Sequence, residues 1–318
     1  MRKKRPLKFK YFLILELLLA VGLTYFFVAR GSQVKQAEPL ASVVEVAPTS
    51  TFPIAEKKAV ETPREPFTRL EAKGVAVYDL SEDKMIFSSH KDDVLPIASI
   101  TKLMTVYTAS KYLTSDSIIT IDQTDIDLDS GSSLVVGEHW NLKNLIAFTL
   151  ITSSNAGANA IAKEAEKQSQ INFVVQMNET AKSIGLQNTI FRNPTGLDIY
   201  EYRISGANST ARDIAYLYSY IYQNSPELLD NTNRQSTSIY SADNIPHYVY
   251  STNEIINEIP ELISAKTGTT PLAGGNFAIL FNPIKDHPVA IVVLGGTSEG
   301  RFFDMKKLIK DTEGALGN

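Results

Sequence analysis

The 318-residue sequence contains no cysteine and only four histidines, and each scarcity removes a class of chemistry. Without cysteine, the chain has no disulfide, no cysteine nucleophile and no thiolate metal site. No histidine lies in a Gly-x-Ser-x-Gly or His-Glu-x-x-His context, so a serine–histidine hydrolase or a zinc peptidase fits poorly. The four histidines are interpreted as surface or structural residues: His90, His139, His247 and His287.

Positive charge is scarce outside the first ten residues. Residues 1–10 hold six basic side chains and no acidic one, whereas the whole chain carries a net charge of −4. The remainder of the chain is therefore acidic. Because a nucleic-acid-binding domain needs a basic face, this distribution argues against a nucleic-acid partner.

A long apolar run follows the basic segment 1–10. Residues 11–29 contain one charged side chain, Glu16, and as a helix they would span about 28 Å, close to the thickness of a bilayer core. The sequence predicts a single-pass anchor in the cell membrane, with segment 1–10 cytoplasmic and the rest of the chain outside. A cleaved signal peptide is the alternative, and it would leave the body secreted or periplasmic.

Residues 30–66 contain scattered prolines and no helical or strand period. This composition predicts a disordered linker. The catalytic domain is expected to occupy residues 67–318.

The pattern from Phe67 onward indicates a folded domain with mixed secondary structure. Two apolar runs, 74–79 and 84–88, flank turn residues and predict a β-hairpin. The remaining elements are predicted as helices at 99–112, 142–150, 156–165, 172–184, 210–222 and 301–310, and as strands at 262–267, 276–281 and 289–295. Because strands occur at both ends, we expect an α+β fold. One antiparallel sheet, flanked by helices, would be built from both ends, with a helical block inserted between them.

Three short motifs occur in order along this domain: Ser99-Ile-Thr-Lys102, Ser153-Ser-Asn155 and Lys266-Thr-Gly268. Each is weak alone, because Ser-x-x-Lys also occurs at 81–84 and 88–91. Spacing of three residues brings two side chains together only on a helix, and only the 99–102 match begins a strongly periodic one. There we expect the serine in the first helical turn, where the helix dipole favours a developing anion.

A serine hydroxyl becomes a strong nucleophile only when a base accepts its proton. Lys102 can be that base if burial and a nearby cation, for which Lys266 is the candidate, lower its pKa. Ser153 could pass the proton to the leaving amine, and backbone N–H groups could stabilise the oxyanion. This chemistry uses no cofactor and no metal.

With these motifs in this order, the chain resembles the D-alanyl-D-alanine carboxypeptidases, which are low-molecular-mass penicillin-binding proteins of serine peptidase family S11. The resemblance covers roughly residues 67–312 and implies a β-lactamase/transpeptidase-like fold. Further matching segments are Gly131-Ser132-Ser133, Gly137-Glu138, Met177-Asn178, Phe191 to Asp198, Ser209 to Asp213, Ser251 to Asn253 and Gly274-Gly275.

The resemblance implies a role for each site residue. Ser99 would be acylated, Lys102 would be its base, and Ser153 would relay the proton. Substrate would be bound by Asn155, Lys266, Thr267, Gly268, Thr269 and Arg301. Within that set, the backbone N–H groups of Ser99 and Thr269 would form the oxyanion hole, and Thr267 would hold the terminal carboxylate. Arg301 would assist with the carboxylate, or it could equally be a surface arginine.

The resemblance also implies the substrate, peptidoglycan stem peptides ending in D-Ala-D-Ala, and β-lactams as covalent inhibitors. Ala156 departs from the family, which often has Asp there, and this could alter support of the second motif. A class A β-lactamase is disfavoured, because the stretch around Asn188 to Asn193 lacks the required Glu. A D,D-carboxypeptidase is the main prediction. A D,D-endopeptidase that cuts cross-links and a catalytically silent wall-binding module remain alternatives.

Overall fold

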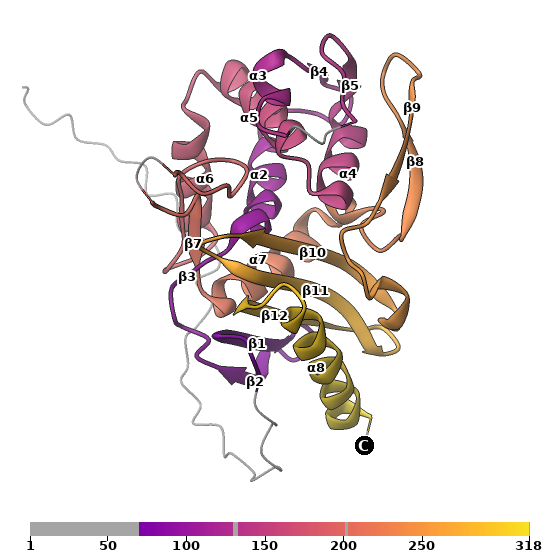
Figure 1. Ribbon diagram of the computed structural model, residues 1–318. Coiled ribbons are helices and arrows are strands. Elements are labelled where there is room, and N and C mark those ends of the chain that lie inside the picture. The colour runs from indigo at the N-terminus through magenta and orange to yellow at the C-terminus, as the bar shows by residue number, and fades with distance from the viewer. Residues whose placement is uncertain (1–69, 130–132, 201–202, 318) are drawn as a thin grey trace, which may run out of the picture. The chain divides into compact units, whose positions relative to one another are not determined.

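We describe a computed structural model in which residues 70–129, 133–200 and 203–317 are placed (Figure 1). The predicted basic segment, apolar segment and linker lie outside the described residues, as do Gly131 and Ser132. The domain boundaries assigned from the sequence therefore stay predictions.

The predicted location in the cell membrane is corrected. In the part of the chain that the structure describes, no helix is both long enough and apolar enough to cross a bilayer. The longest, α8 (Gly300–Leu316), has 17 residues, or about 26 Å of helix, and it packs against the central sheet. Segment 11–29, on which the prediction rested, lies outside the described residues.

A five-stranded antiparallel sheet is built from both ends of the domain, as predicted (Figure 1). Its order is β10 (Leu262–Thr270), β11 (Gly274–Ile284), β12 (His287–Gly296), β1 (Gly74–Asp79) and β2 (Lys84–Ser89). Strand β10 is thus an edge strand of this sheet, and an edge strand has backbone groups available for another chain to pair with.

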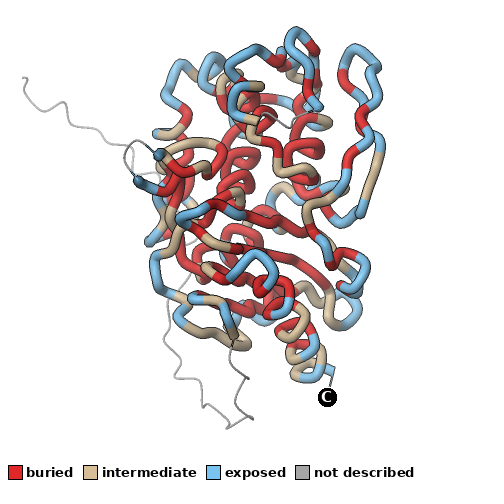
Figure 2. Tube along the Cα trace, in the orientation of Figure 1, coloured by how far each residue is buried: buried red, intermediate tan, exposed pale blue. Residues whose placement is uncertain are grey.

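Both faces of the sheet are buried, which explains why its central strands are almost wholly apolar (Figure 2). Side chains alternate between the two faces along each strand. Val77 and Ile291, opposite each other in register, pack with α8 on one face. Ala76 and Val292, also opposite each other, belong to the larger core on the other face, where α7 (Ala211–Asn224) covers the sheet.

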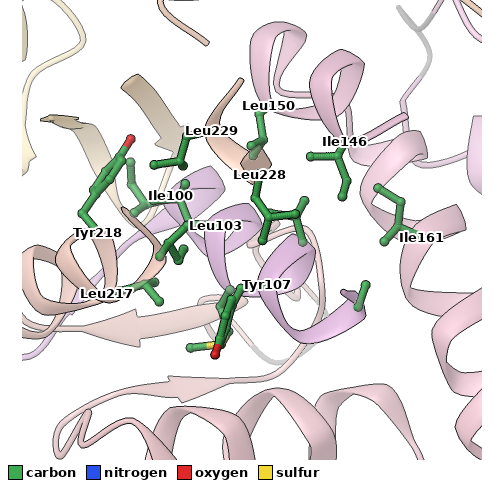
Figure 3. Packing of buried hydrophobic residues seen from close by; sticks show 14 of the residues in the cluster. Ile100, Leu103, Tyr107, Ile146, Leu150, Ile161, Leu217, Tyr218, Leu228 and Leu229 are labelled. Atoms are coloured by element: carbon green, nitrogen blue, oxygen red, sulfur yellow. The ribbon is translucent and has the colours of Figure 1, made fainter. Parts of the chain in front are cut away.

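Helix α2 (Thr101–Ala109) lies in the middle of the helical block, and all nine of its residues are buried. The sequence predicted a helix from 99 to 112 with one apolar face, but neighbouring elements surround it (Figure 3). The side chain of its second residue, Lys102, is therefore shielded from water. The other helical elements are η1 (Ala98–Ile100), α3 (Gln123–Ile126), α4 (Leu142–Thr152), α5 (Asn155–Ser169), α6 (Phe173–Ser183), η2 (Pro226–Leu229) and η3 (Ile256–Glu258).

Small sheets that the sequence analysis did not predict connect the helices. The hairpin of β8 (Ser236–Tyr240) and β9 (Pro246–Tyr250) packs against α4. The others pair β4 (Ile118–Thr120) with β5 (His139–Asn141), and β3 (Leu95–Pro96) with β7 (Ala207–Ser209) and β6 (Ile190–Phe191). Short strands of two or three residues carry too little sequence pattern to be predicted.

Candidate active site

The first motif lies where a 3-10 turn leads into α2. Ser99 is in the turn η1, not in the first turn of an α-helix as predicted. Ala98 precedes it with a φ of +47°, a left-handed conformation that costs energy for a residue with a side chain. The resulting bend places the Ser99 Oγ 2.8 Å from the Lys102 Nζ.

Lys102 is fully buried and has three oxygen partners. Besides Ser99, its Nζ donates to the Asn155 Oδ1 at 2.8 Å and to the Thr195 carbonyl oxygen at 2.9 Å. Burial lowers the pKa of Lys102 to about 7, although the nearby Asp129 carboxylate acts in the opposite direction. A lysine with this pKa is partly neutral near pH 7 and can accept a proton.

The second motif begins at the end of α4. Ser153 ends that helix with a φ of +61°, another left-handed residue with a side chain. The Lys266 Nζ donates to the Ser153 Oγ at 2.8 Å and to the Thr267 carbonyl oxygen at 2.7 Å. This second serine–lysine pair joins residues 113 positions apart, whereas Ser99 and Lys102 are three apart.

Lys266 on β10 is as buried as Lys102, but its electrostatics differ. Burial is the main cause that lowers its pKa well below the usual value, and the charges of Lys102 and Arg301 lower it further. The sequence analysis had assigned the neighbouring-cation effect to Lys102. In the structure, burial is the main cause for both lysines, and the repulsion between their charges disfavours the charged form of each.

The third motif packs against the nucleophile because Gly268 has no side chain. A Cβ at this position would lie 2.9 Å from the Ile97 carbonyl oxygen and 3.0 Å from the Ser99 backbone nitrogen. On the same strand, the Thr267 hydroxyl is 2.6 Å from that of Thr252. The close approach brings the backbone of β10 beside the Ser99 N–H, as an oxyanion hole from these two segments requires.

Arg301 is buried near the start of α8, so its alternative interpretation as a surface arginine is wrong. Its Nη1 donates to the Gly268 carbonyl oxygen at 3.1 Å and also to the Thr269 hydroxyl. Burial lowers its pKa, while the charge of Glu254 acts to raise it. Arg301 thus supports the strand that carries Thr267 and Thr269.

The sequence analysis missed an acidic residue that holds the second motif. Asp129 accepts hydrogen bonds through its Oδ2 from the Ser154 Oγ and from the Asn155 backbone N–H, both at 2.9 Å. Asp129 therefore supports the second motif. The sequence analysis had asked whether this support is altered, because Ala156 stands where the family often has Asp. No spacing pattern links Asp129 to residues 25 positions later, so only the folded chain reveals it.

The two other Ser-x-x-Lys matches lie outside the site. Lys84 is paired with Glu82 and Lys91 with Asp92, and both lysines are solvent-accessible. Over residues 70–129, 133–200 and 203–317, no group of three or more His, Asp or Glu side chains is arranged to hold a metal ion.

A serine hydrogen-bonded to a buried lysine, beside a second serine–lysine pair and an edge strand, is the arrangement expected of a serine-nucleophile acyl-transfer enzyme. Residues 57–298 match the model of peptidase family S11, described as D-alanyl-D-alanine carboxypeptidase. The chain belongs to this family and is a serine-type D-Ala-D-Ala peptidase. The family, the α+β fold and this activity, all expected from the sequence, are thereby confirmed.

Individual relatives agree with this assignment. The chain is 32% identical over 251 residues to a D-alanyl-D-alanine endopeptidase of Escherichia coli K12, covering 76% of each chain. It is 27% identical to D-alanyl-D-alanine carboxypeptidase DacC of the same organism, over 83% of this chain and 64% of that one. It also resembles ampicillin-bound penicillin-binding protein D2 of Listeria monocytogenes, with 27% identity, a TM-score of 0.66, and coverage of 77% and 98%.

Proposed function

We propose that this protein removes the terminal D-Ala from peptidoglycan stem pentapeptides through an acyl-enzyme on Ser99. The observation that carries the proposal is the 2.8 Å contact between the Lys102 Nζ and the Ser99 Oγ. Neutral Lys102 accepts the hydroxyl proton while the Ser99 oxygen attacks the carbonyl carbon of the penultimate D-Ala. An ester to Ser99 then forms as the C–N bond to the terminal D-Ala breaks.

The second serine–lysine pair supplies the proton that the leaving amine needs. Ser153 is hydrogen-bonded to Lys266, so it can donate its hydroxyl proton to the amine and recover one from the lysine network. Water then hydrolyses the ester and regenerates the Ser99 hydroxyl. The close packing of Gly268 on the Ser99 backbone supports an oxyanion hole formed by the N–H groups of Ser99 and Thr269.

Buried positive charge explains why a substrate with a free carboxylate would be preferred. Lys266 and Arg301 are both largely removed from water and lie on or against β10. An anion placed beside them compensates the cost of burying these cations. We assign the carboxylate of the terminal D-Ala to Thr267 and Lys266, with Arg301 supporting the strand. Asn155 is assigned to the substrate backbone.

β-Lactams are proposed as covalent inhibitors at the same serine. The ampicillin-bound relative from Listeria and a cefotaxime-bound form of the same protein support this assignment. A labelled penicillin should acylate the full-length chain at Ser99, and a peptide ending in D-Ala-D-Ala should release free D-Ala. A folded protein that takes no label and releases no D-Ala would instead favour the wall-binding module.

Endopeptidase cleavage of peptide cross-links is the second candidate. It uses the same bond chemistry, with the amine of a neighbouring stem peptide as the leaving group. The relatives from Escherichia coli, Haemophilus influenzae and Pseudomonas aeruginosa with 27–32% identity are endopeptidases by name, which favours this alternative. Mass analysis of digested cross-linked muropeptides separates the two activities, because only an endopeptidase converts dimers into monomers.

A further inference from the structure

The outward face of the β8–β9 hairpin carries exposed tyrosines and no charged side chain. Tyr240, Tyr248 and Tyr250 are 52%, 62% and 64% exposed. The rings of Tyr248 and Tyr250 meet edge to face, with centroids 5.1 Å apart, and the Tyr248 hydroxyl is 3.2 Å from the Ser236 Oγ. The pairing register places these residues on one face, the hairpin face, which consists of Ser236, Ser238, Tyr240, Pro246, Tyr248 and Tyr250.

The opposite face fixes the hairpin to the helical block. Val249 is buried, and the His247 Nε2 lies 2.6 Å from the Glu138 Oε1 in a buried contact. The His247 ring also packs on Trp140, with centroids 4.8 Å apart. Because this side is anchored by packing and a buried polar contact, the tyrosines are presented on a fixed support, which lowers the entropy that binding costs.

The hairpin face leads directly to the leaving-group side of the active site. The Ser251 N–H continues the pairing by donating to the Gln235 carbonyl oxygen, and the next residue, Thr252, contacts Thr267 through their hydroxyls. The Thr252 N–H also donates to the Ile151 carbonyl oxygen, two residues before Ser153. Thr252 lies in a bend two residues beyond the end of β9, so a short stretch of chain joins the hairpin face to the active site.

Distance and chemistry indicate the occupant. Because a chain spans at most about 3.6 Å per residue, the Cα of Tyr250 lies within about 7 Å of that of Thr252, and the Cα of Tyr248 within about 14 Å. The three residues that join a cross-linked amine to its sugar span about 10 Å when extended. Sugar rings have an apolar face that stacks on aromatic rings, and their hydroxyls bond to tyrosine and serine. A neutral, hydroxyl-bearing aromatic surface of this kind suits a saccharide better than a charged partner.

We propose that the hairpin face binds the glycan strand that carries the leaving stem peptide of cross-linked peptidoglycan. This inference rests on the proposed function, because Ser153 defines the leaving-group side only if it protonates the leaving amine. The face would give a cross-linked polymer a second contact that a free pentapeptide does not make. It therefore deepens the endopeptidase alternative by naming the part of the substrate that would be recognised.

The test measures competition against acylation of the full-length chain by a labelled penicillin. Two competitors are compared: a cross-linked muropeptide dimer with its disaccharides, and the same dimer after an amidase has removed the sugars. Stacking of sugar rings on the two tyrosines should make the sugar-bearing dimer about tenfold the better competitor. In the variant Tyr248→Ser/Tyr250→Ser, the two dimers should compete equally well. The acylation rate of this variant without a competitor is the reference. Phe303→Ser, which changes a 67% exposed ring on α8, should keep it.

Equal competition by the two dimers on the unmodified protein would overturn the inference. So would self-association that the double substitution abolishes, because it would assign the hairpin face to a second copy of the chain. The proposed function fails separately, through the absence of penicillin labelling on the folded protein. The competition does not depend on whether the dimer is cleaved.

Discussion

The nucleophile side of the site, formed by η1 and α2, and the strand side, formed by β10, each contain a buried lysine, but the two lysines are held differently. Lys102 has three oxygen partners, and burial lowers its pKa to about 7. The pKa of Lys266 is lowered by burial and further by two neighbouring cations. A group with a pKa near 7 suits proton transfer, whereas a carboxylate bound beside Lys266 and Arg301 would favour the charged form of that lysine. The same residue type is therefore proposed for two roles, because its surroundings differ.

The largest effect should come from removing the nucleophile. Ser99→Ala should lower acylation by a labelled penicillin by about 10⁴-fold or more, because Ser99 is the one hydroxyl that bonds to Lys102 among the described residues. Gel fluorescence and mass spectrometry of the labelled peptide measure this. Ser88→Ala, in a second Ser-x-x-Lys sequence, is the matched control and should label normally. Retained labelling in Ser99→Ala would move the nucleophile away from the η1–α2 side.

Lys266→Gln tests the strand side and should reduce kcat/KM for a D-Ala-D-Ala peptide by about 10²- to 10³-fold. The loss arises because both the donor to Ser153 and a cation near the substrate carboxylate are removed. The unmodified protein should prefer the peptide to its C-terminal amide, and the variant should show a smaller preference. Lys91→Gln changes a lysine that pairs with Asp92 and should leave the preference intact. An unchanged preference in Lys266→Gln would separate Lys266 from carboxylate binding.

Gly268→Ala tests the contact between the two sides. The added methyl group would lie within 3.0 Å of backbone atoms of Ile97 and Ser99, so β10 must shift away from the nucleophile. A displacement of this size should cost about 10²-fold in the acylation rate. Gly314→Ala, where a methyl group meets nothing within 4 Å, is the control and should acylate normally. A normal rate in Gly268→Ala would show that the close approach is dispensable.

Much of the fold could be predicted because its signals are local. The hairpin of β1 and β2, the three C-terminal strands and the main helices all follow from apolar period and turn residues. Thr210 caps α7 by accepting from the Asp213 N–H. The Asp213 carboxylate does not complete the reciprocal bond of a capping box. It binds the Asn188 N–H and the Thr189 hydroxyl instead, because tertiary partners replaced the local one.

The site could be predicted only where a motif carries it. The three motifs contain all four residues of the two serine–lysine pairs, and the proposed proton transfers require these residues to be in contact. The Thr195 carbonyl, Thr252 and Asp129 could not be assigned roles in this way, since their contacts depend on how distant segments pack. The left-handed conformations of Ala98 and Ser153 were also invisible, because neither residue type signals a positive φ.

The smallest predicted effect is a shift in the pH dependence that Asp129 produces on the nucleophile side. Neutral Lys102 is the proposed base, so acylation should rise as the pH passes upward through about 7. Asp129 raises the pKa of Lys102, and therefore Asp129→Asn should lower this pKa and move the inflection to lower pH. The asparagine keeps an acceptor for Ser154 and Asn155, so the second motif should remain supported. Stopped-flow acylation between pH 5 and 9 measures the inflection.

The exposed Asp127, two residues earlier, bonds to the Gln123 side chain and provides the control Asp127→Asn, which should leave the inflection in place. An inflection that stays or moves to higher pH in Asp129→Asn would show that its carboxylate does not act on Lys102. If Lys266→Gln moved the inflection as far as Asp129→Asn does, the two sides would titrate together as one unit. The contrast between Lys102 and Lys266 therefore depends on which substitution moves the pH profile and which changes the preference for a free carboxylate.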